Sequence, residues 1–376
     1  MRKFFDSNAL WLGMLIGALG YKIFLPLKPS LPWLIFFMLF FTFCKVDPKD
    51  LRLHKWHWVV LFSQITLSFA TYALTLHLSG DPILAQGLLM CFIMPTATAA
   101  PIIAGKMGGS IQNLTTFTLL SNFATAIIVP ATFPFINPTA DMTFWPAFFL
   151  ILRRIAPLLL GPFFLAWIVR IIYKWRTRQD FVLPVKIAVV PFYLWVCSIT
   201  VLTSVVTETT ILNFDSQISN ILILLVASFF ICLFQFGVGK LIGYYLPAPS
   251  KGKDYQDVLI NPAAAPKTME GVSSITAGQA FGQKNTSLGV WMAQTYLHPL
   301  AALGAAAYII WQNIFNSVQL FVVAHKKIIT TYQNKNHHEK NLLFIRCRAF
   351  RSKHDGNRFH LVQRSACNAG RGYGYL

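Results

Sequence analysis

Long apolar stretches alternate with short polar segments along most of this chain. Ten stretches are long and apolar enough to predict helices that cross a lipid bilayer. Residues 144–152 are predicted to lie flat at the membrane interface before the sixth span, because Arg153 and Arg154 would be costly at the bilayer centre. The pattern predicts an all-α integral membrane protein. The ten spans are 8–25, 30–45, 55–77, 83–105, 111–135, 154–173, 186–206, 217–246, 268–295 and 298–323.

Two of these spans, the fourth and the ninth, are interrupted by polar and helix-breaking residues. Residues 94–101 read Met-Pro-Thr-Ala-Thr-Ala-Ala-Pro, and residues 277–287 read Ala-Gly-Gln-Ala-Phe-Gly-Gln-Lys-Asn-Thr-Ser. Lipid cannot satisfy free backbone groups, so such an interruption is buried in protein or lines a cavity. Ten spans divide as five plus five, and the interrupted span is then the fourth of each half. This arrangement predicts an inverted repeat with a binding site between the interruptions, as in many secondary transporters.

Basic residues are concentrated in alternate connecting segments. The segments after the second, sixth and eighth spans each carry several Lys or Arg, whereas residues 78–82, 136–143 and 207–216 carry none. Cytoplasmic loops are enriched in Lys and Arg, so this alternation predicts that both termini are cytoplasmic. The short loops fit a bacterial inner membrane.

Composition and charge divide the chain into two expected regions. The chain is 55% hydrophobic and 12% charged, which excludes an ordinary soluble protein, and its net charge is +19. Much of that charge lies in residues 326–376, where Lys and Arg greatly outnumber acidic residues. We expect a transmembrane domain over 1–325 and a basic, disordered cytoplasmic tail over 326–376. A tail attracted to anionic lipid or nucleic acid is the alternative; we expect no nucleic-acid partner.

Lys284 is the main candidate for a functional residue. A lysine at membrane depth normally faces a cavity and has a function; alternatively, it snorkels to the interface or pairs with a helix C-terminus. Gln283, Asn285, Thr286 and Ser287 offer side-chain oxygens beside it, or else form hydrogen bonds between helices.

The first interruption supplies three further candidates. They are Thr96, Thr98 and Pro101. Pro101 is expected to free a backbone carbonyl one turn back, which could face a substrate or an ion; a simple kink is the alternative.

The two interrupted segments, the ten-span layout and the stretch Trp311-Gln312-Asn313-Ile314 of the last span resemble the bile acid:sodium symporter family. Three motifs are the most specific part of this resemblance. They are Pro95-x-x-Thr98-Ala99 followed by Gly108-Gly109, the run Gly282-Gln283-Lys284-Asn285-Thr286-Ser287-Leu288, and His298-Pro299-Leu300-Ala301-Ala302. The resemblance covers roughly residues 8–323. It implies a core domain of spans three to five and eight to ten, a panel domain of the remaining spans, and two interrupted helices that cross near the midplane. It also implies an organic-anion substrate, usually driven by two sodium ions.

The sequence departs from the family pattern at the sodium positions. Ala100-Pro101 stand where the family has a Ser-Asn pair, although the hydroxyl of Thr118 is retained. Ala280, with Gln279 beside it, stands where the family has a Glu, and Lys284 stands where the family has a Gln. An ammonium group there would repel a cation. We hypothesise that Lys284 acts as a fixed positive charge or as a proton carrier, which leaves sodium and protons open as coupling ions.

The expected function is secondary active transport of a small or amphipathic organic anion by alternating access. The expected partners are this substrate and the lipid bilayer, with no cofactor and no bound metal. The alternative is a transport-inactive membrane sensor that signals through its cytoplasmic tail. An enzyme is not expected, because the chain lacks HExxH, GxSxG and paired intramembrane carboxylates.

Overall fold

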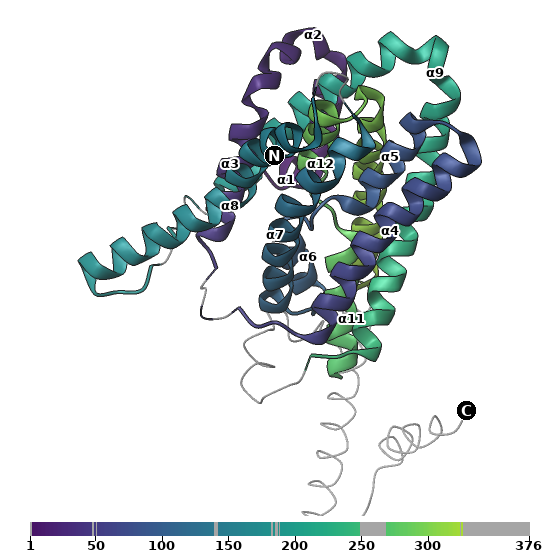
Figure 1. Ribbon diagram of the computed structural model, residues 1–376. Helices are drawn as coiled ribbons and strands as arrows, with labels where there is room; N and C mark the ends of the chain where they lie inside the picture. Colours follow the sequence, from purple (N-terminus) through teal and green to yellow (C-terminus); the bar gives the residue numbers. More distant parts are fainter. Residues whose placement is uncertain are drawn as a thin grey trace, which may run out of the picture. The chain divides into compact units, whose positions relative to one another are not determined.

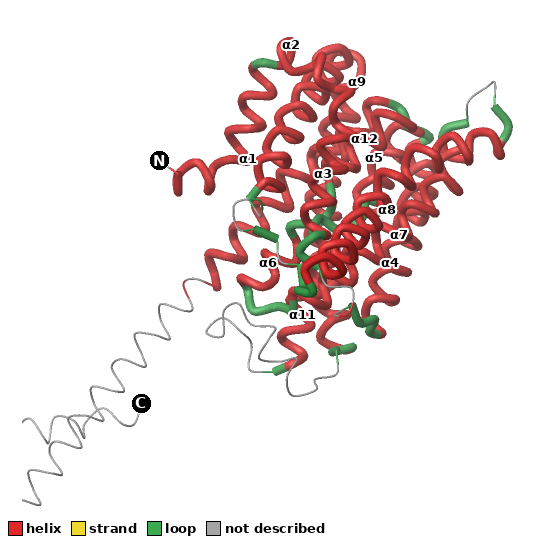
Figure 2. The backbone as a smooth tube through the Cα atoms, turned by 90° about the vertical axis from the view of Figure 1, so that its left-hand side faces the viewer, coloured by secondary structure: helices red, strands yellow, loops and turns green. Residues whose placement is uncertain are grey.

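The computed structural model of this chain is built from helices (Figures 1 and 2). It describes residues 2–46, 49, 51–138, 142–181, 183, 184, 187, 189–248, 268–323 and 325. The prediction of an all-α fold is confirmed for these residues, while the predicted tail over 326–376 lies outside them. The elements are α1 (Arg2–Leu19), α2 (Tyr21–Phe24), η1 (Leu25–Ser30), α3 (Leu31–Phe43), α4 (Lys55–Ser79), α5 (Pro82–Ile93), α6 (Ala100–Lys106), α7 (Ile111–Ile136), α8 (Phe144–Thr177), α9 (Val190–Tyr245), α11 (Met269–Gly282), α12 (Thr286–Tyr296) and η3 (Pro299–Ala301).

Six helical stretches in the described part of the chain are long and apolar enough to cross a membrane. Large apolar side chains on their surfaces, such as Trp33, Phe62 and Phe230, are more than half exposed. Water would make such exposure unfavourable, whereas lipid favours it, so the fold is that of a multi-pass membrane protein. The ten-span count stays a prediction. The six stretches are Tyr21–Phe43, Lys55–Ser79, Ile111–Ile136, Phe144–Thr177, Val190–Tyr245 and Pro299–Val323.

Helix α9 is too long to cross a bilayer once. Its 56 residues would extend about 84 Å as a straight helix, against about 30 Å for the hydrocarbon core. Gln217 leaves the helical conformation, with φ −130° and ψ 20°. Figure 1 shows α9 changing direction along its course. The predicted seventh and eighth spans fall largely on the two sides of this kink.

Helix α8 corrects one prediction. Residues 144–152 were expected to form an interfacial segment before the sixth span, yet α8 is continuous from Phe144 to Thr177 and passes through Arg153 and Arg154. Pro146 lies in the first turn, where a missing N–H costs no helical hydrogen bond. The charge of two arginines opposes burial in lipid, but it does not break backbone hydrogen bonds, so the predicted boundary was wrong.

Close packing of α9 against α11 positions the second half of the core. A Cβ atom on Gly243 would lie 2.1 Å from the Ser273 carbonyl oxygen, and one on Gly239 would lie 2.5 Å from the Ala277 carbonyl oxygen. Only glycine permits this approach of the two backbones. Helix α11 is therefore held against α9 directly before the residues that follow Gly282.

Candidate binding site at two paired linkers

Two short non-helical linkers meet inside the helical unit. The first, 94–99, joins α5 to α6, and the second, 283–285, joins α11 to α12. Thr96 and Lys284 form an antiparallel bridge between them. The Asn285 amide donates to the Pro95 carbonyl at 2.7 Å, and the Ala97 amide donates to the Gln283 carbonyl at 2.9 Å. Segments far apart in sequence thus share one short backbone pairing.

Local chemistry explains why the helices begin and end at these linkers. Pro95 has no N–H and disfavours helical conformation in the residue before it, so α5 cannot continue through it. Asn285 caps α12 by accepting a hydrogen bond from the Leu288 amide at 3.2 Å. Pro101 lies at the start of α6. The Ala97 carbonyl, one turn before Pro101, accepts from the Ala100 amide at 3.1 Å. The expectation that Pro101 frees a carbonyl one turn back was therefore wrong for this carbonyl.

Side chains from other elements satisfy the carbonyl groups at the ends of α5 and α11. The last carbonyls of a helix lack partners within the helix, and lipid offers none. In this structure Cys91 O accepts from Gln235 Nε2 (3.0 Å), Phe92 O from Lys284 Nζ (3.1 Å), Met94 O from Gln64 Nε2 (3.0 Å), Ala280 O from Thr96 Oγ1 (2.7 Å) and Gly282 O from the Tyr308 hydroxyl (2.7 Å).

Lys284 is fully buried at the centre of this arrangement. Its ammonium donates to the Phe92 carbonyl and lies 5.1 Å from the centroid of the Phe281 ring. The partial negative charge at the C-terminal end of α5 and the face of the ring both favour a cation. Among the described residues, no carboxylate forms an ion pair with Lys284. Lys284 therefore does not snorkel to an interface in this conformation, and its charge is not neutralised by an acidic side chain.

Gln312 fixes the backbone of Lys284. Its side-chain oxygen accepts from the Lys284 amide at 2.9 Å, and its side-chain nitrogen donates to the Lys284 carbonyl at 3.2 Å. A single amide thus replaces both backbone partners that a helix would have supplied. The second linker is held in one conformation, which directs the ammonium toward α5.

Two amide groups beside Lys284 retain hydrogen-bonding capacity. Gln283 Oε1 and Asn285 Nδ2 are buried and have no hydrogen-bond partner in the described part of the chain. A buried polar atom without a partner costs free energy, so a ligand that supplied the missing partner would be favoured. One acceptor and one donor are therefore available at the paired linkers.

Some of the other predicted residues lie beside the linkers, and others form hydrogen bonds elsewhere. Thr286 and Ser287 begin α12 beside Asn285. In α11, Gln279 Nε2 donates to Asn316 Oδ1 at 3.2 Å. Thr118 instead donates to the Leu114 carbonyl of its own helix at 2.9 Å. All ten predicted side chains are buried: Thr96, Thr98, Pro101, Thr118, Gln279, Gln283, Lys284, Asn285, Thr286 and Ser287.

Sequence reasoning missed the residues that support the linkers. Gln64, Gln235 and Tyr308 donate to carbonyls around the linkers. Ser121 accepts from the Thr96 amide at 3.2 Å. Buried glutamines within the otherwise apolar helices α4 and α9 were the available signal, because an uncharged polar group in lipid needs a partner on another helix.

The sequence matches no protein-family model and no curated protein. The likeness to the bile acid:sodium symporter family therefore rests on the sequence motifs and the predicted ten-span layout. The geometry of the paired linkers is independent of that likeness.

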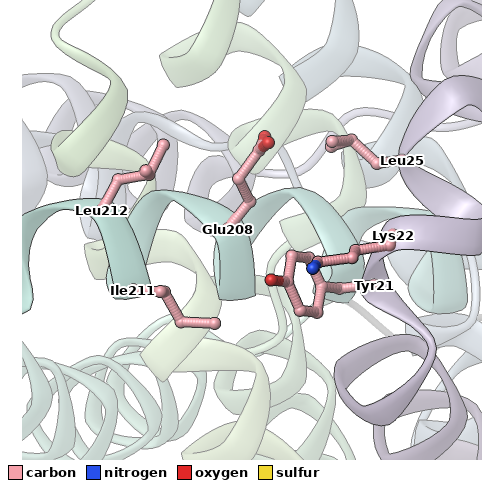
Figure 3. A pocket seen from close by; sticks show the side chains of 6 residues that line it. All are labelled: Tyr21, Lys22, Leu25, Glu208, Ile211 and Leu212. Carbon is pink, nitrogen blue, oxygen red and sulfur yellow. The ribbon is translucent and has the colours of Figure 1, made fainter.

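A surface hollow of about 240 Å³ lies away from the predicted residues (Figure 3). It combines the carboxylate of Glu208 with the ammonium of Lys22 and several apolar side chains. None of the ten predicted residues lines it, so it is not the predicted site. Its lining consists of Tyr21, Lys22, Leu25, Glu208, Ile211 and Leu212.

Proposed function

We propose that this chain is a secondary active transporter of a small or amphipathic organic anion, similar to the bile acid:sodium symporters. The observation that carries this proposal is the buried ammonium of Lys284, which lies at the paired linkers without a carboxylate partner among the described residues. The proposal includes ten spans arranged as two inverted halves, with one linker in each half.

Electrostatics favours an anionic substrate at this position. A lysine at the centre of a membrane helix costs about 2.5–3.5 kcal/mol, and a ligand carboxylate beside it would offset that cost. The unpartnered Asn285 Nδ2 offers a hydrogen-bond donor close by, at the N-terminus of α12. A helix N-terminus also carries partial positive charge, which suits an anion.

Burial of all the predicted residues supports alternating access. A substrate could not reach Lys284 or Asn285 in this conformation, because both side chains are buried. Access therefore requires the helices around the linkers to move. Secondary transporters with paired interrupted helices open their site to one side of the membrane at a time.

Lys284 also bears on the coupling ion. Its ammonium already donates a hydrogen bond to the Phe92 carbonyl at the end of α5. A sodium ion placed within a few ångströms would be strongly repelled in so dry an environment. We propose that the fixed charge of Lys284 replaces a bound sodium ion, and that a proton gradient or the substrate gradient alone drives transport.

Uptake into proteoliposomes tests this function. A panel of labelled organic anions is offered while a sodium gradient, a proton gradient or neither is imposed. We expect uptake of at least one anion without sodium. Uptake that requires sodium would contradict the proposed role of Lys284, and uptake of no anion would contradict transport.

Lys284→Gln tests the residue itself. Loss of the positive charge should reduce anion uptake at least tenfold or abolish its pH dependence. Lys240→Gln is the matched control, since Lys240 is a partly buried lysine of α9 that is expected to leave uptake unchanged. Equal uptake and equal pH dependence in Lys284→Gln and the unaltered protein would show that the ammonium has no role.

A further inference from the structure

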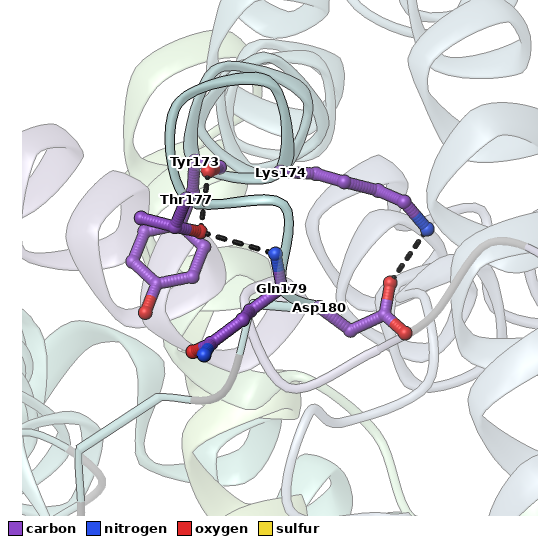
Figure 4. Close-up of polar contacts among 5 residues, drawn as sticks. All are labelled: Tyr173, Lys174, Thr177, Gln179 and Asp180. Carbon is purple, nitrogen blue, oxygen red and sulfur yellow. Dashed lines mark hydrogen bonds and ion pairs between the residues drawn. The ribbon is translucent and has the colours of Figure 1, made fainter.

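The surface hollow shown in Figure 3 contains two side chains of opposite charge that form no ion pair among the described residues. Lys22 is exposed, and its ammonium lies 5.9 Å from the centroid of the Tyr21 ring. Glu208 is partly buried. Elsewhere on the surface two opposite charges do pair, since Lys174 Nζ lies 2.8 Å from Asp180 Oδ1 (Figure 4). The hollow therefore retains one cation and one carboxylate that can bind a ligand.

Packing of α1, α2 and η1 against α9 forms the hollow. A Cβ atom on Gly17 would lie 2.3 Å from the Thr200 carbonyl oxygen, so the backbones of α1 and α9 touch at that point. The chain then continues into α2 and η1, which also pack against α9. On α9, Glu208, Ile211 and Leu212 are three and four residues apart and therefore share one face of the helix. The hollow lies between this face and the residues that follow α1.

The hollow lies at the boundary of the membrane-spanning region. Tyr21 begins the apolar stretch Tyr21–Phe43, and tyrosine favours the level of the lipid headgroups. On α9, the polar run Asn-Phe-Asp-Ser-Gln of residues 213–217 follows within two turns of Glu208. Leu212, in contrast, is apolar and 75% exposed. The hollow therefore faces lipid headgroups on one side and acyl chains on the other.

The charges of the hollow select a zwitterionic ligand. A ligand that carries only negative charge would be repelled by Glu208, and one that carries only positive charge would be repelled by Lys22. An ammonium group with N–H bonds can donate a charge-assisted hydrogen bond to a carboxylate, which a quaternary ammonium cannot. The volume of about 240 Å³ is smaller than the roughly 300–1,000 Å³ of pockets for drug-sized molecules, so it suits a headgroup.

We propose that this hollow binds the headgroup of a phospholipid that carries a primary ammonium group, as phosphatidylethanolamine does. Lys22 binds the phosphate, and Glu208 accepts hydrogen bonds from the ammonium. Leu25, Ile211 and Leu212 contact the glycerol and the first part of the acyl chains. No residue of the paired linkers lines the hollow, so this proposal does not depend on the proposed transport.

Native mass spectrometry of the full-length protein tests the lipid preference. The protein is titrated in detergent with phosphatidylethanolamine, phosphatidylcholine and phosphatidylglycerol that have the same acyl chains. Phosphatidylethanolamine should bind about fivefold more tightly than either of the others, the effect of about one charged contact at a membrane surface. Equal binding of phosphatidylcholine would overturn the proposal, because that lipid differs only in lacking ammonium N–H groups.

Glu208→Gln tests the carboxylate. The variant should lose the preference for phosphatidylethanolamine over phosphatidylcholine, and it should bind phosphatidylglycerol about fivefold more tightly because the repulsion is gone. Misfolding would not raise an affinity, so this gain separates lipid recognition from a loss of structure. Asp215→Asn is the matched control, since Asp215 is an exposed carboxylate of α9 outside the hollow and its loss should leave all three affinities unchanged.

Lys22→Gln tests the cation. Phosphatidylethanolamine binding should weaken about fivefold, whereas Lys28→Gln, which alters an exposed lysine of η1 outside the hollow, should have no effect. The site would be refuted if Lys22→Gln bound this lipid as tightly as the unaltered protein, or if Glu208→Gln kept the original preference. Displacement of the lipid by an equal concentration of phosphoethanolamine, the headgroup without acyl chains, would also refute it by showing a site for small soluble zwitterions.

Discussion

At the paired linkers, individual side chains donate the hydrogen bonds that backbone carbonyls receive from backbone amides inside a helix. Phe92, Met94 and Gly282 each offer a carbonyl whose partner is a side chain from elsewhere in the fold. Lys284 differs from the other donors because it is an ionisable group as well as a hydrogen-bond donor. Its side chain therefore stabilises the end of α5 in this conformation.

Gln312→Leu tests how firmly the second linker is held. The leucine would leave the Lys284 amide and carbonyl without their present partner, at a cost of about 1–3 kcal/mol for each buried group. We expect a clear fall in Tm in detergent. Asn313→Leu is the control, because Asn313 donates to the Ile309 carbonyl of its own helix. Equal Tm values for the two variants would show that Gln312 does not hold the linker.

At the level of elements, helix contact depends on a few small residues. Gly239 and Gly243 let α11 approach α9, and Gly237 on the same helix has no heavy atom within 4 Å of a built Cβ. Gly239 and Gly243 thus have a packing role, whereas Gly237 does not. The same contact carries Gly282 and the second linker to their place beside α5.

Gly243→Leu should destabilise the protein by about 1–3 kcal/mol or more, since overpacking forces the two backbones apart. Thermal unfolding in detergent measures the change. Gly237→Leu is the matched control on α9, because its side chain would enter unoccupied space. It should leave Tm nearly unchanged. If Gly237→Leu were as destabilising as Gly243→Leu, helix approach would not be the cause.

At the scale of the whole molecule, the apolar exterior indicates a protein that crosses the membrane several times. Residues Met1–Val318 form one compact unit. The turn between α4 and α5 and the kink region of α9 share contacts, since Asn220 Nδ2 is hydrogen-bonded to Asp81. These two connections therefore lie side by side.

Cysteine accessibility tests the predicted orientation. In a variant with Cys197, Cys347 and Cys367 replaced by Ser, single substitutions Asp81→Cys and Lys106→Cys are labelled in intact cells with a membrane-impermeant thiol reagent. The positive-inside pattern predicts labelling at 81 and protection at 106. Labelling at 106 with protection at 81 would reverse the orientation, and labelling at both would contradict the assigned spans.

The sequence by itself determined the features that depend on local chemistry. Runs of apolar residues predicted a helical membrane protein, and the polar and helix-breaking residues within 94–101 and 277–287 marked two interruptions. Pro95 contributes to the first of them because proline acts on its own turn of backbone. Lys284 was identified as a candidate because placing a lysine within an apolar, membrane-spanning stretch costs free energy.

Tertiary structure alone decided which groups meet. The pairing of Thr96 with Lys284, and the partners Phe92, Gln235 and Gln312, join residues from different helices. Their selection depends on how α5, α9 and α11 pack, and no local pattern encodes that packing. The continuity of α8 through its arginines has the same origin: hydropathy reports the cost of burial, whereas backbone hydrogen bonds and packing determine where a helix begins.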